Sequence, residues 1–318
     1  MSIAIERSTG AQPKPLLRPR VKEELKGWLF ASPWIIGFLL FTAAPMLFSI
    51  YASFTEYNIT TAPRWIGLGN YRELFQDPYF YTGLLNTFWM VIVKTPLVIV
   101  IAIGLALLLA MDLPGGRFFR TVFYLPNVLA GVAAVFLWKW ILAPDGLLNR
   151  ALGLIGIHNG PGWFSDPAWT KPGLVVMGMW WIGGSVLIYL AGLKNIPQEL
   201  YEAGSLDGAV GWSKFRYITL PMLSPTIFFQ VVTGIIGTFQ IFTTAFIISG
   251  SDPFFAGQSL LFYVLYLYYR AFGKLGPAGF QMGFASAMAW ILFLIIMAFT
   301  VFQLRLSKRW VYYEDEGR

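Results

Sequence analysis

Six long apolar stretches dominate this sequence and leave few folds open to it. Each has about 20 residues or more, which is enough for a helix to cross the hydrocarbon core of a bilayer. The six stretches therefore predict an all-α integral membrane protein with six transmembrane helices. They are Trp28–Ser53, Leu84–Ala110, Phe119–Leu142, Gly173–Leu193, Leu220–Ile248 and Phe284–Leu304.

The composition agrees with a membrane protein. Of the 318 residues, 57% are hydrophobic and 12% are charged, whereas a soluble domain carries about 25% charged residues. The chain has no cysteine, which excludes disulfides and thiolate chemistry. The N-terminus lacks a short apolar core with a small-residue cleavage site, so we expect the first apolar stretch to be a retained span.

A seventh apolar stretch, Ser259–Ala271, is about 13 residues long, which is too short to span a bilayer. Its length suits a helix that lies at the membrane interface. Counting it as a span would also place the basic C-terminal residues on the opposite side from the basic N-terminus. We therefore expect an external scaffold helix at about residues 259–271.

The distribution of lysine and arginine predicts the orientation of the six spans. With both termini inside, the tail 1–27 holds six of these residues, the second-to-third loop two, the loop after the fourth span three and the tail 305–318 four, against six outside. Basic residues are retained on the cytoplasmic side. The sequence thus predicts a transmembrane domain over residues 28–304 with cytoplasmic N- and C-terminal tails. The net charge of +7 needs no nucleic-acid partner to explain it.

The longest polar stretch on the predicted cytoplasmic side, Pro197–Pro225, is called the polar segment below. Pro197 can open a helix because its missing N–H has no partner in a first turn. Gly208 is placed to end that helix in a left-handed conformation. Ser213 can cap a second short helix, which Pro221 bends into the next apolar run. The sequence alone is also compatible with a solvated helix–turn–helix loop.

The order Glu-Ala-x-x-x-Asp-Gly-Ala within the polar segment, followed by Phe215 and Pro221, resembles the EAA loop of the membrane subunits of binding-protein-dependent ABC importers. In that family the loop forms coupling helices that sit in a cleft of the ATPase subunit. Gly204 departs from the pattern, which usually has Ala or Ser there. The resemblance implies direct contact of Glu202 with the ATPase and a turn set by Asp207, Gly208 and Ala209. The coupling residues it implies are Glu202, Ala203, Gly204, Asp207, Gly208, Ala209, Phe215 and Pro221.

Other stretches resemble the sugar-type permeases of the same family, and the resemblance covers about residues 28–310. It implies the type I ABC importer permease fold in the cytoplasmic (inner) membrane, surrounded by lipid. It also implies a second permease subunit in a heterodimer, two ATPase subunits and an external solute-binding protein. The solute would be an oligosaccharide, a disaccharide or a glycerol-phosphate compound. The stretches are 65–71, 77–80, 86–87, 125–126, 144–149 and 163–167, whereas 249–257 departs from the usual turn.

The sequence offers little bond chemistry. His158 is the sole histidine, in a predicted external loop, so a histidine-based metal site or catalytic base has no second histidine to work with. Gly273-Lys274 is followed by Leu275, so the chain has no phosphate-cradling Gly-x-x-x-x-Gly-Lys-Ser/Thr run. We therefore expect no catalysis, no metal and no cofactor on this chain, with ATP and magnesium bound by the partner ATPases. A membrane-embedded enzyme would need a His/Asp/Glu cluster that is missing.

None of the six spans contains Asp or Glu. Ion-coupled carriers usually use intramembrane carboxylates as ion sites, so a secondary carrier driven by an ion gradient is the alternative that this absence disfavours. A protein that only scaffolds other subunits also stays open. Two lysines lie within spans: Lys139, near a span end where it can snorkel, and Lys94, which is deeper. At that depth Lys94 is expected to face protein or water, in a structural or a functional role.

A stripe of small and polar residues recurs at helical spacing in the fifth span. In a membrane such a stripe usually packs against another helix. By position from the EAA loop it also falls where the maltose-type permeases line the sugar path, and Trp180, Trp181 and Gly184 of the fourth span correspond to the facing wall. The tryptophans have the further interpretation of interfacial belt residues. The stripe consists of Gln230, Gly234, Gly237, Thr238 and Ile241.

Overall fold

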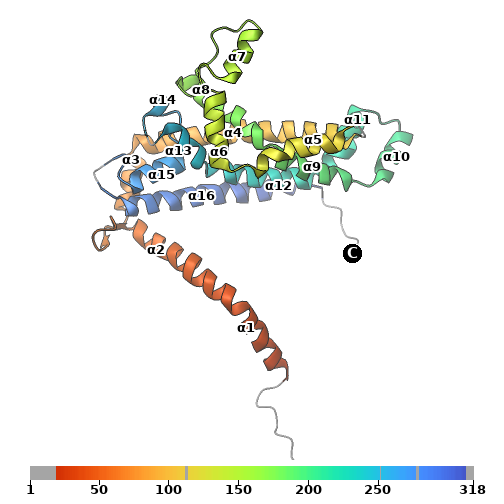
Figure 1. The fold of residues 1–318 in the computed structure, drawn as a ribbon. Coiled ribbons are helices and arrows are strands. Elements are labelled where there is room, and N and C mark those ends of the chain that lie inside the picture. Colours follow the sequence, from red (N-terminus) through yellow and green to blue (C-terminus); the bar gives the residue numbers. More distant parts are fainter. Residues whose placement is uncertain (1–18, 112–113, 251, 277–278, 313–318) are drawn as a thin grey trace, which may run out of the picture. The chain divides into compact units, whose positions relative to one another are not determined.

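The computed structural model describes residues 19–111, 114–250, 252–276 and 279–312. Apart from one short β-hairpin, the described chain is helical (Figure 1). The N-terminal half holds α1 Pro19–Phe38, η1 Leu39–Ala43, α2 Ala44–Ser53, β1 Thr55–Glu56, β2 Arg64–Trp65, α3 Gly69–Gln76, α4 Pro78–Ala110, α5 Gly116–Tyr124, η2 Leu125–Val128, α6 Gly131–Ile141 and α7 Leu147–Leu154. The C-terminal half holds α8 Pro167–Gly178, η3 Met179–Trp181, α9 Gly183–Lys194, α10 Gln198–Leu206, α11 Trp212–Lys214, η4 Phe215–Thr219, α12 Leu220–Phe239, α13 Thr243–Ser249, α14 Phe255–Gln258, α15 Tyr263–Ala271 and α16 Met282–Ser307.

The chain divides into two units, residues 1–51 and 52–318. In the first, α1, η1 and the start of α2 form a helix that is apolar around its circumference, with Phe30 91% and Phe41 82% exposed. Such a helix needs lipid or another protein around it. Residues 1–18 of the tail expected over 1–27 lie outside the described residues, and the rest of it is already in α1.

Among the described residues, four helices are long and apolar enough to cross a bilayer, or up to six spans if each of two bent helix pairs is counted as one. This agrees with the six predicted spans. The third and fourth predicted spans correspond to the two bent pairs, so each is interrupted by a sharp bend that the apolar pattern does not reveal. α5 and η2 meet α6 at 103°, and α8 with η3 meets α9 at 52°. Leu129 and Ala130 have extended backbone at the first break, where Pro126 has already interrupted the α-helical hydrogen bonding.

In the second unit, α4 packs against α9 and α12, and α12 packs against α16 (Figure 1). Small residues of α4, Ala102 and Ala106, are fully buried against Val186 and Tyr189 of α9. Small side chains let two helices approach closely in a membrane protein, where van der Waals packing drives helix association. This close packing fixes the position of α4 relative to the fourth predicted span.

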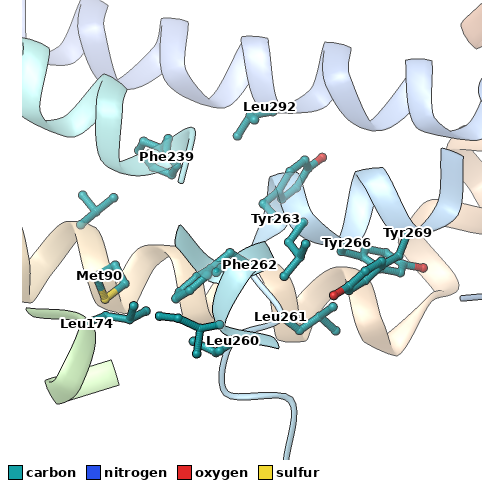
Figure 2. Close-up of a cluster of buried hydrophobic side chains, with 14 of the residues drawn as sticks. Met90, Leu174, Phe239, Leu260, Leu261, Phe262, Tyr263, Tyr266, Tyr269 and Leu292 are labelled. Atoms are coloured by element: carbon teal, nitrogen blue, oxygen red, sulfur yellow. The ribbon is translucent and has the colours of Figure 1, made fainter. Parts of the chain in front are cut away.

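A second core surrounds α15. Figure 2 shows Tyr263, Tyr266 and Tyr269 of this helix among the apolar side chains that its neighbours supply. All three tyrosines have 0% exposure, and α15 contacts both α4 and α16. The segment expected to be an external scaffold helix over 259–271 is covered by protein, and its place at the membrane interface stays a prediction. The helix itself is also shorter, since residues 260–262 form a turn before it.

The loops gather at two ends of the second unit. At one end, the amide of Tyr312 donates to Ser224 Oγ at 2.8 Å, and Met111 lines a pocket together with Trp212 and Phe215. This end therefore holds the polar segment, the C-terminus of α4 and the residues after α16. At the other end, Ser259 Oγ donates to the carbonyl oxygen of Pro167 at 3.1 Å, close to α14 and α15.

Candidate functional site

The polar segment folds as two short helices joined by a tight turn. α10 ends at Leu206, and Gly208 follows with a left-handed φ of +81°. The amide of Ala209 donates to the carbonyl oxygen of Gly204 at 2.8 Å, which closes the turn. The predicted left-handed glycine at position 208 is confirmed, and its conformation is one that a side chain at Cα disfavours.

The second short helix begins differently from the prediction. Gly211 is the residue before α11, and its φ of +46° and ψ of −110° turn the chain into the helix. Ser213 lies inside α11, so the prediction that its hydroxyl caps the helix is wrong. Pro197 likewise precedes α10 instead of occupying its first position. Neither helix start has a capping hydrogen bond from the side chain of the residue before it, which is a proline or a glycine.

The two arms of the polar segment are held together at Gly204. A Cβ added to Gly204 would lie 2.6 Å from Ile218 Cδ1, so the glycine gives Ile218 of η4 its place against α10. One turn away, the hydroxyls of Tyr201 and Thr219 hydrogen-bond at 3.0 Å. The close contact is with the end of a flexible side chain, so Gly204 favours this approach without requiring it. The two contacts join α10 to η4 as one hairpin.

The tip of this hairpin exposes apolar side chains. Glu202 and Asp207 are exposed as expected for a solvated loop, but several large apolar residues beside them are exposed as well. A contiguous exposed apolar surface with charged neighbours is typical of a protein contact site. The sequence analysis did not assign most of these residues to a site, although an apolar residue at the centre of a polar loop could have indicated a contact surface. They are Leu206 (90% exposed), Val210 (74%), Trp212 (74%) and Tyr217 (74%).

The hairpin continues into α12 without a break in helical structure. η4 is a π-helical turn that ends at Thr219, two residues before Pro221, and the amide of Leu220 donates to the carbonyl oxygen of Phe215. Proline has no N–H, and its ring clashes with the carbonyl four residues earlier, which the wider π-turn accommodates. Phe215 itself is half-buried, and its ring packs against that of Trp212 in a tilted arrangement with the ring centres 5.0 Å apart. Pro221 and Phe215 thus connect the exposed hairpin to a long transmembrane helix.

A polar cavity of about 410 Å³ lies between α4, α12 and the fourth span. Gln230, Gly234, Gly237 and Thr238 of α12 and Trp181 of η3 all line it, so the structure brings together five of the eight residues expected on a substrate path. Lys94, Thr95, Ser185 and Thr233 line it too, together with Val98, Ile99, Gly178 and Ile182. This space is called the Lys94 cavity below.

One wall of the Lys94 cavity is a close crossing of α4 and α12. The Oγ1 atoms of Thr95 and Thr238 hydrogen-bond at 3.3 Å. A Cβ added to Gly234 would lie 3.2 Å from Thr95 Cγ2, so the glycine allows this crossing. The stripe on α12 therefore has both of the properties that its sequence suggested, since Gly234 serves helix packing and borders the cavity. Its role in a substrate path remains a proposal.

Three of the expected path residues lie elsewhere. Trp180 packs edge-on against Trp138 at 5.6 Å and lines a separate, apolar pocket between α4, α5 and η3. Gly184 faces Asn127: with the amide oriented to satisfy both of its atoms, the Gly184 amide donates to Asn127 Oδ1 at 3.3 Å. Ile241 lies in the break between α12 and α13. Helical spacing alone could not reveal these positions, because the fourth and fifth predicted spans are both interrupted.

The cavity residues that the sequence did not assign come mostly from α4. Lys94 was noted only as a deep charge, and Thr95, Thr233 and Ser185 were not noted as path residues. The available signal was that Lys94-Thr95 is the single polar pair within the apolar run 88–110. Lys139, the second intramembrane lysine, instead directs Nζ to the carbonyl oxygens of Ile247 and Ile248 at 3.3 and 3.4 Å, at the C-terminus of α13.

Comparison with known proteins identifies the family. Residues 84–312 match the family described as binding-protein-dependent transport system inner membrane component. The chain belongs to this family. The match contains the polar segment, the Lys94 cavity and α15, and it begins six residues inside α4. The chain is thus a permease subunit of an ABC importer, which decides against the ion-gradient carrier that the sequence had left as the alternative.

Curated relatives and a solved structure agree along most of the chain. The probable ABC transporter permease protein YesP of Bacillus subtilis (strain 168) is 42% identical over 297 residues, covering 93% of this chain and 94% of the relative. The lactose transport system permease protein LacF of Rhizobium radiobacter is 37% identical and covers 69% and 74% of the two chains. A chain of the bacterial alginate ABC transporter, solved with an alginate pentasaccharide-bound periplasmic protein, superposes with a TM-score of 0.76 at 23% identity, covering 91% and 96%.

These matches confirm the fold expected from the sequence, a helical multi-pass membrane permease of the type found in ABC importers.

Proposed function

We propose that this permease is one of two different membrane subunits that together form the path for an oligosaccharide or disaccharide, with the Lys94 cavity on that path. The relatives named for lactose and alginate support a saccharide solute. The polar groups of the cavity suit such a solute, because hydroxyl and amide side chains can hydrogen-bond sugar hydroxyls and Trp181 offers an aromatic face.

The observation that carries the proposal is the continuity of α12 between the exposed hairpin and the cavity. From Leu220, next to the π-turn, to Thr238 in the cavity wall is about 27 Å of one helix. A displacement of the hairpin is therefore transmitted along the continuous helix α12 to Gln230, Gly234 and Thr238. In the proposed cycle, ATP closes the ATPase dimer, the hairpin follows its cleft, and the path changes from inward- to outward-facing.

The proposed partners are two ATPase subunits, which bind ATP and magnesium, and an extracytoplasmic solute-binding protein. This chain would carry out no bond chemistry and bind no cofactor. We further propose that both termini and the polar segment face the cytoplasm in the cytoplasmic membrane. The grouping of the polar segment with the residues after α16 at one end of the bundle supports a shared side for the two.

A crosslinking experiment tests both the contact and the orientation. Because the chain has no cysteine, a single Leu206→Cys substitution places one thiol at the hairpin tip, where the residue is 90% exposed. In the assembled importer, a short bifunctional maleimide should link position 206 to an ATPase subunit that carries cysteines in its cleft. Leu154→Cys, on α7 and 89% exposed, is the matched control and should give no such product. Labelling of position 206 by an impermeant reagent from outside intact cells would overturn the proposal.

A further inference from the structure

The Lys94 cavity holds one charged side chain and nothing to neutralise it. Of the described residues that line the cavity, Lys94 is the only charged one, and the other polar members are hydroxyls and one amide. Lys94 forms no ion pair with any residue that the structure describes; the cationic partners in the ion pairs there are Arg64 and Arg270. A charge held inside a membrane protein without a counter-charge is costly and is usually tied to function.

The surroundings keep this cation in the cavity. Lys94 is the seventeenth residue of the 33-residue helix α4, so its side chain is far from either helix end. Gly178 leaves the space that the lysine occupies: a Cβ there would lie 3.1 Å from Lys94 Cε and 3.7 Å from Nζ. A residue with a side chain at position 178 would compete with the ammonium group for this place. The absence of a side chain thus lets Lys94 lie along the cavity wall.

Gln230 adds an independent observation at the same place. Its Nε2 is buried and has no hydrogen-bond partner in the described structure. A buried donor without an acceptor is unfavourable, so such a group in a native protein calls for a partner that arrives from elsewhere. The neighbouring hydroxyls of Thr95 and Thr238 already bond to each other. The cavity therefore offers a cation and an amide donor, on two different helices, and both lack an acceptor.

We propose that the imported saccharide carries a carboxylate, as a uronic-acid residue does, and that Lys94 and Gln230 bind this group as the solute passes. This inference rests on the proposed function, which places the cavity on the path. A carboxylate has two oxygens that accept hydrogen bonds in one plane, so it satisfies both orphan donors at once. A neutral sugar hydroxyl satisfies the amide of Gln230 but leaves the charge of Lys94 without a partner.

The test uses the complete importer in proteoliposomes, with its binding protein, and two labelled probes: digalacturonate and its uncharged methyl ester. The measured quantity is the ratio of ATP-dependent uptake of the acid to uptake of the ester. We expect the wild-type ratio to exceed ten, the Lys94→Met ratio to fall at least tenfold, and the Lys94→Arg ratio to recover in part. Lys171→Met is the matched control, because Lys171 lies outside the cavity over the ring of Trp89. Its ratio should equal the wild-type ratio.

The binding step is measured separately from uptake. Isothermal titration of digalacturonate into the detergent-purified importer, with both permeases and both ATPase subunits but without the external binding protein, should show at least tenfold weaker binding for Lys94→Met and weaker binding for Gln230→Leu. Phosphorylated and sulfonated sugars share the anionic oxygens and serve as competing probes. If either of them displaces digalacturonate at a lower concentration, the site is an anion site of a different class and the carboxylate assignment is overturned.

Two further outcomes count against the inference, and they differ from failure of the proposed function. If the ester is imported with ATP and Lys94→Met leaves the acid-to-ester uptake ratio unchanged, the proposed importer function is supported and the proposed anion site is refuted. The anion site is also refuted if replacing one carboxylate of the second permease by its amide restores uptake in a Lys94→Met variant. That result would show that the second permease supplies the counter-charge of Lys94. If no saccharide is imported with ATP, the proposed function and this inference fail together.

Discussion

Arg270 and Asp77, 193 residues apart in the sequence, form a buried ion pair with a distance of 2.8 Å between Nη1 and Oδ2. Their side chains are 5% and 8% exposed. Arg270 also donates from Nε to Gln281 Oε1 at 2.6 Å and lies 3.7 Å from the centre of the Phe284 ring. The pair therefore ties α15 to the start of α4 and to the start of α16.

Tyr266 belongs to the same cluster, and its hydroxyl donates to Asp77. Burial raises the pKa of Tyr266, and the hydrogen bond to Asp77 raises it further. The hydroxyl therefore stays a donor throughout the physiological pH range, and it shares Oδ2 of Asp77 with Arg270, while Oδ1 accepts from the amide of Tyr79.

Removing Arg270 should destabilise the second unit strongly. Arg270→Ala leaves Asp77 as an uncompensated buried charge, which costs about 3–5 kcal/mol. The matched control is Arg64→Ala, because the Arg64–Glu56 pair has side chains 76% and 62% exposed and such pairs contribute about 1 kcal/mol or less. Thermal unfolding of the detergent-purified permease measures both. Equal shifts in Tm for the two variants would contradict the structural role of the buried pair.

Two adjacent glycines should differ sharply in their tolerance of alanine. A Cβ on Gly183 would lie 1.9 Å from the carbonyl oxygen of Phe123, a backbone atom that cannot move without displacing α5. A Cβ on Gly184 would meet Asn127 Oδ1 at 3.4 Å, an ordinary contact. We expect Gly183→Ala to destabilise by about 1–3 kcal/mol and to lower the amount of permease in the membrane, whereas Gly184→Ala stays near wild type. Quantitative immunoblots of membranes and thermal unfolding give the comparison.

Substitution at Gly208 should uncouple the permease from the ATPase without preventing membrane insertion. Open space surrounds the position, so Gly208→Asp acts through the φ of +81° and through the added charge. A non-glycine residue in the left-handed region costs about 1–2 kcal/mol, and asparagine tolerates it better than most. We expect ATP-driven uptake to fall several-fold in Gly208→Asp and less in Gly208→Asn. Normal uptake together with normal ATP turnover in Gly208→Asp would remove the coupling role of this turn.

The contact between Gly204 and Ile218 predicts a compensating pair. Gly204→Ala requires Ile218 Cδ1 to move from 2.6 Å, which the end of a flexible side chain can do, whereas Gly204→Val adds atoms that it cannot avoid. We expect uptake close to wild type for Gly204→Ala and a several-fold loss for Gly204→Val. Shortening the neighbour in the double variant Gly204→Val/Ile218→Ala should restore part of the loss. Strictly additive effects in this double-mutant cycle would show that the contact does not hold the hairpin together.

The sequence by itself determined the class of fold, because apolar runs of about 20 residues have few other stable conformations. It also determined local backbone conformation: the residue at position 208, just after the end of α10, is a glycine, and it adopts the left-handed conformation. The family could be read from the polar segment, since a motif of many fixed positions depends only on the order of residues. In each of these cases the physical cause lies within one stretch of chain.

Only the tertiary structure decided which residues meet. Lys94 and Gln230 line one cavity because α4 and α12 cross at Thr95 and Thr238, which are 143 residues apart in the sequence. Trp180 and Ile241 lie outside that cavity because Trp180 belongs to the 3₁₀ turn η3 and Ile241 follows the end of α12, so neither keeps the periodicity of a continuous α-helix. The burial of the helix over 263–271 likewise depends on the faces that α4 and α16 present to it. Helix packing in a membrane is fixed by complementary shape and a few polar contacts between distant segments, and a one-dimensional pattern does not contain that information.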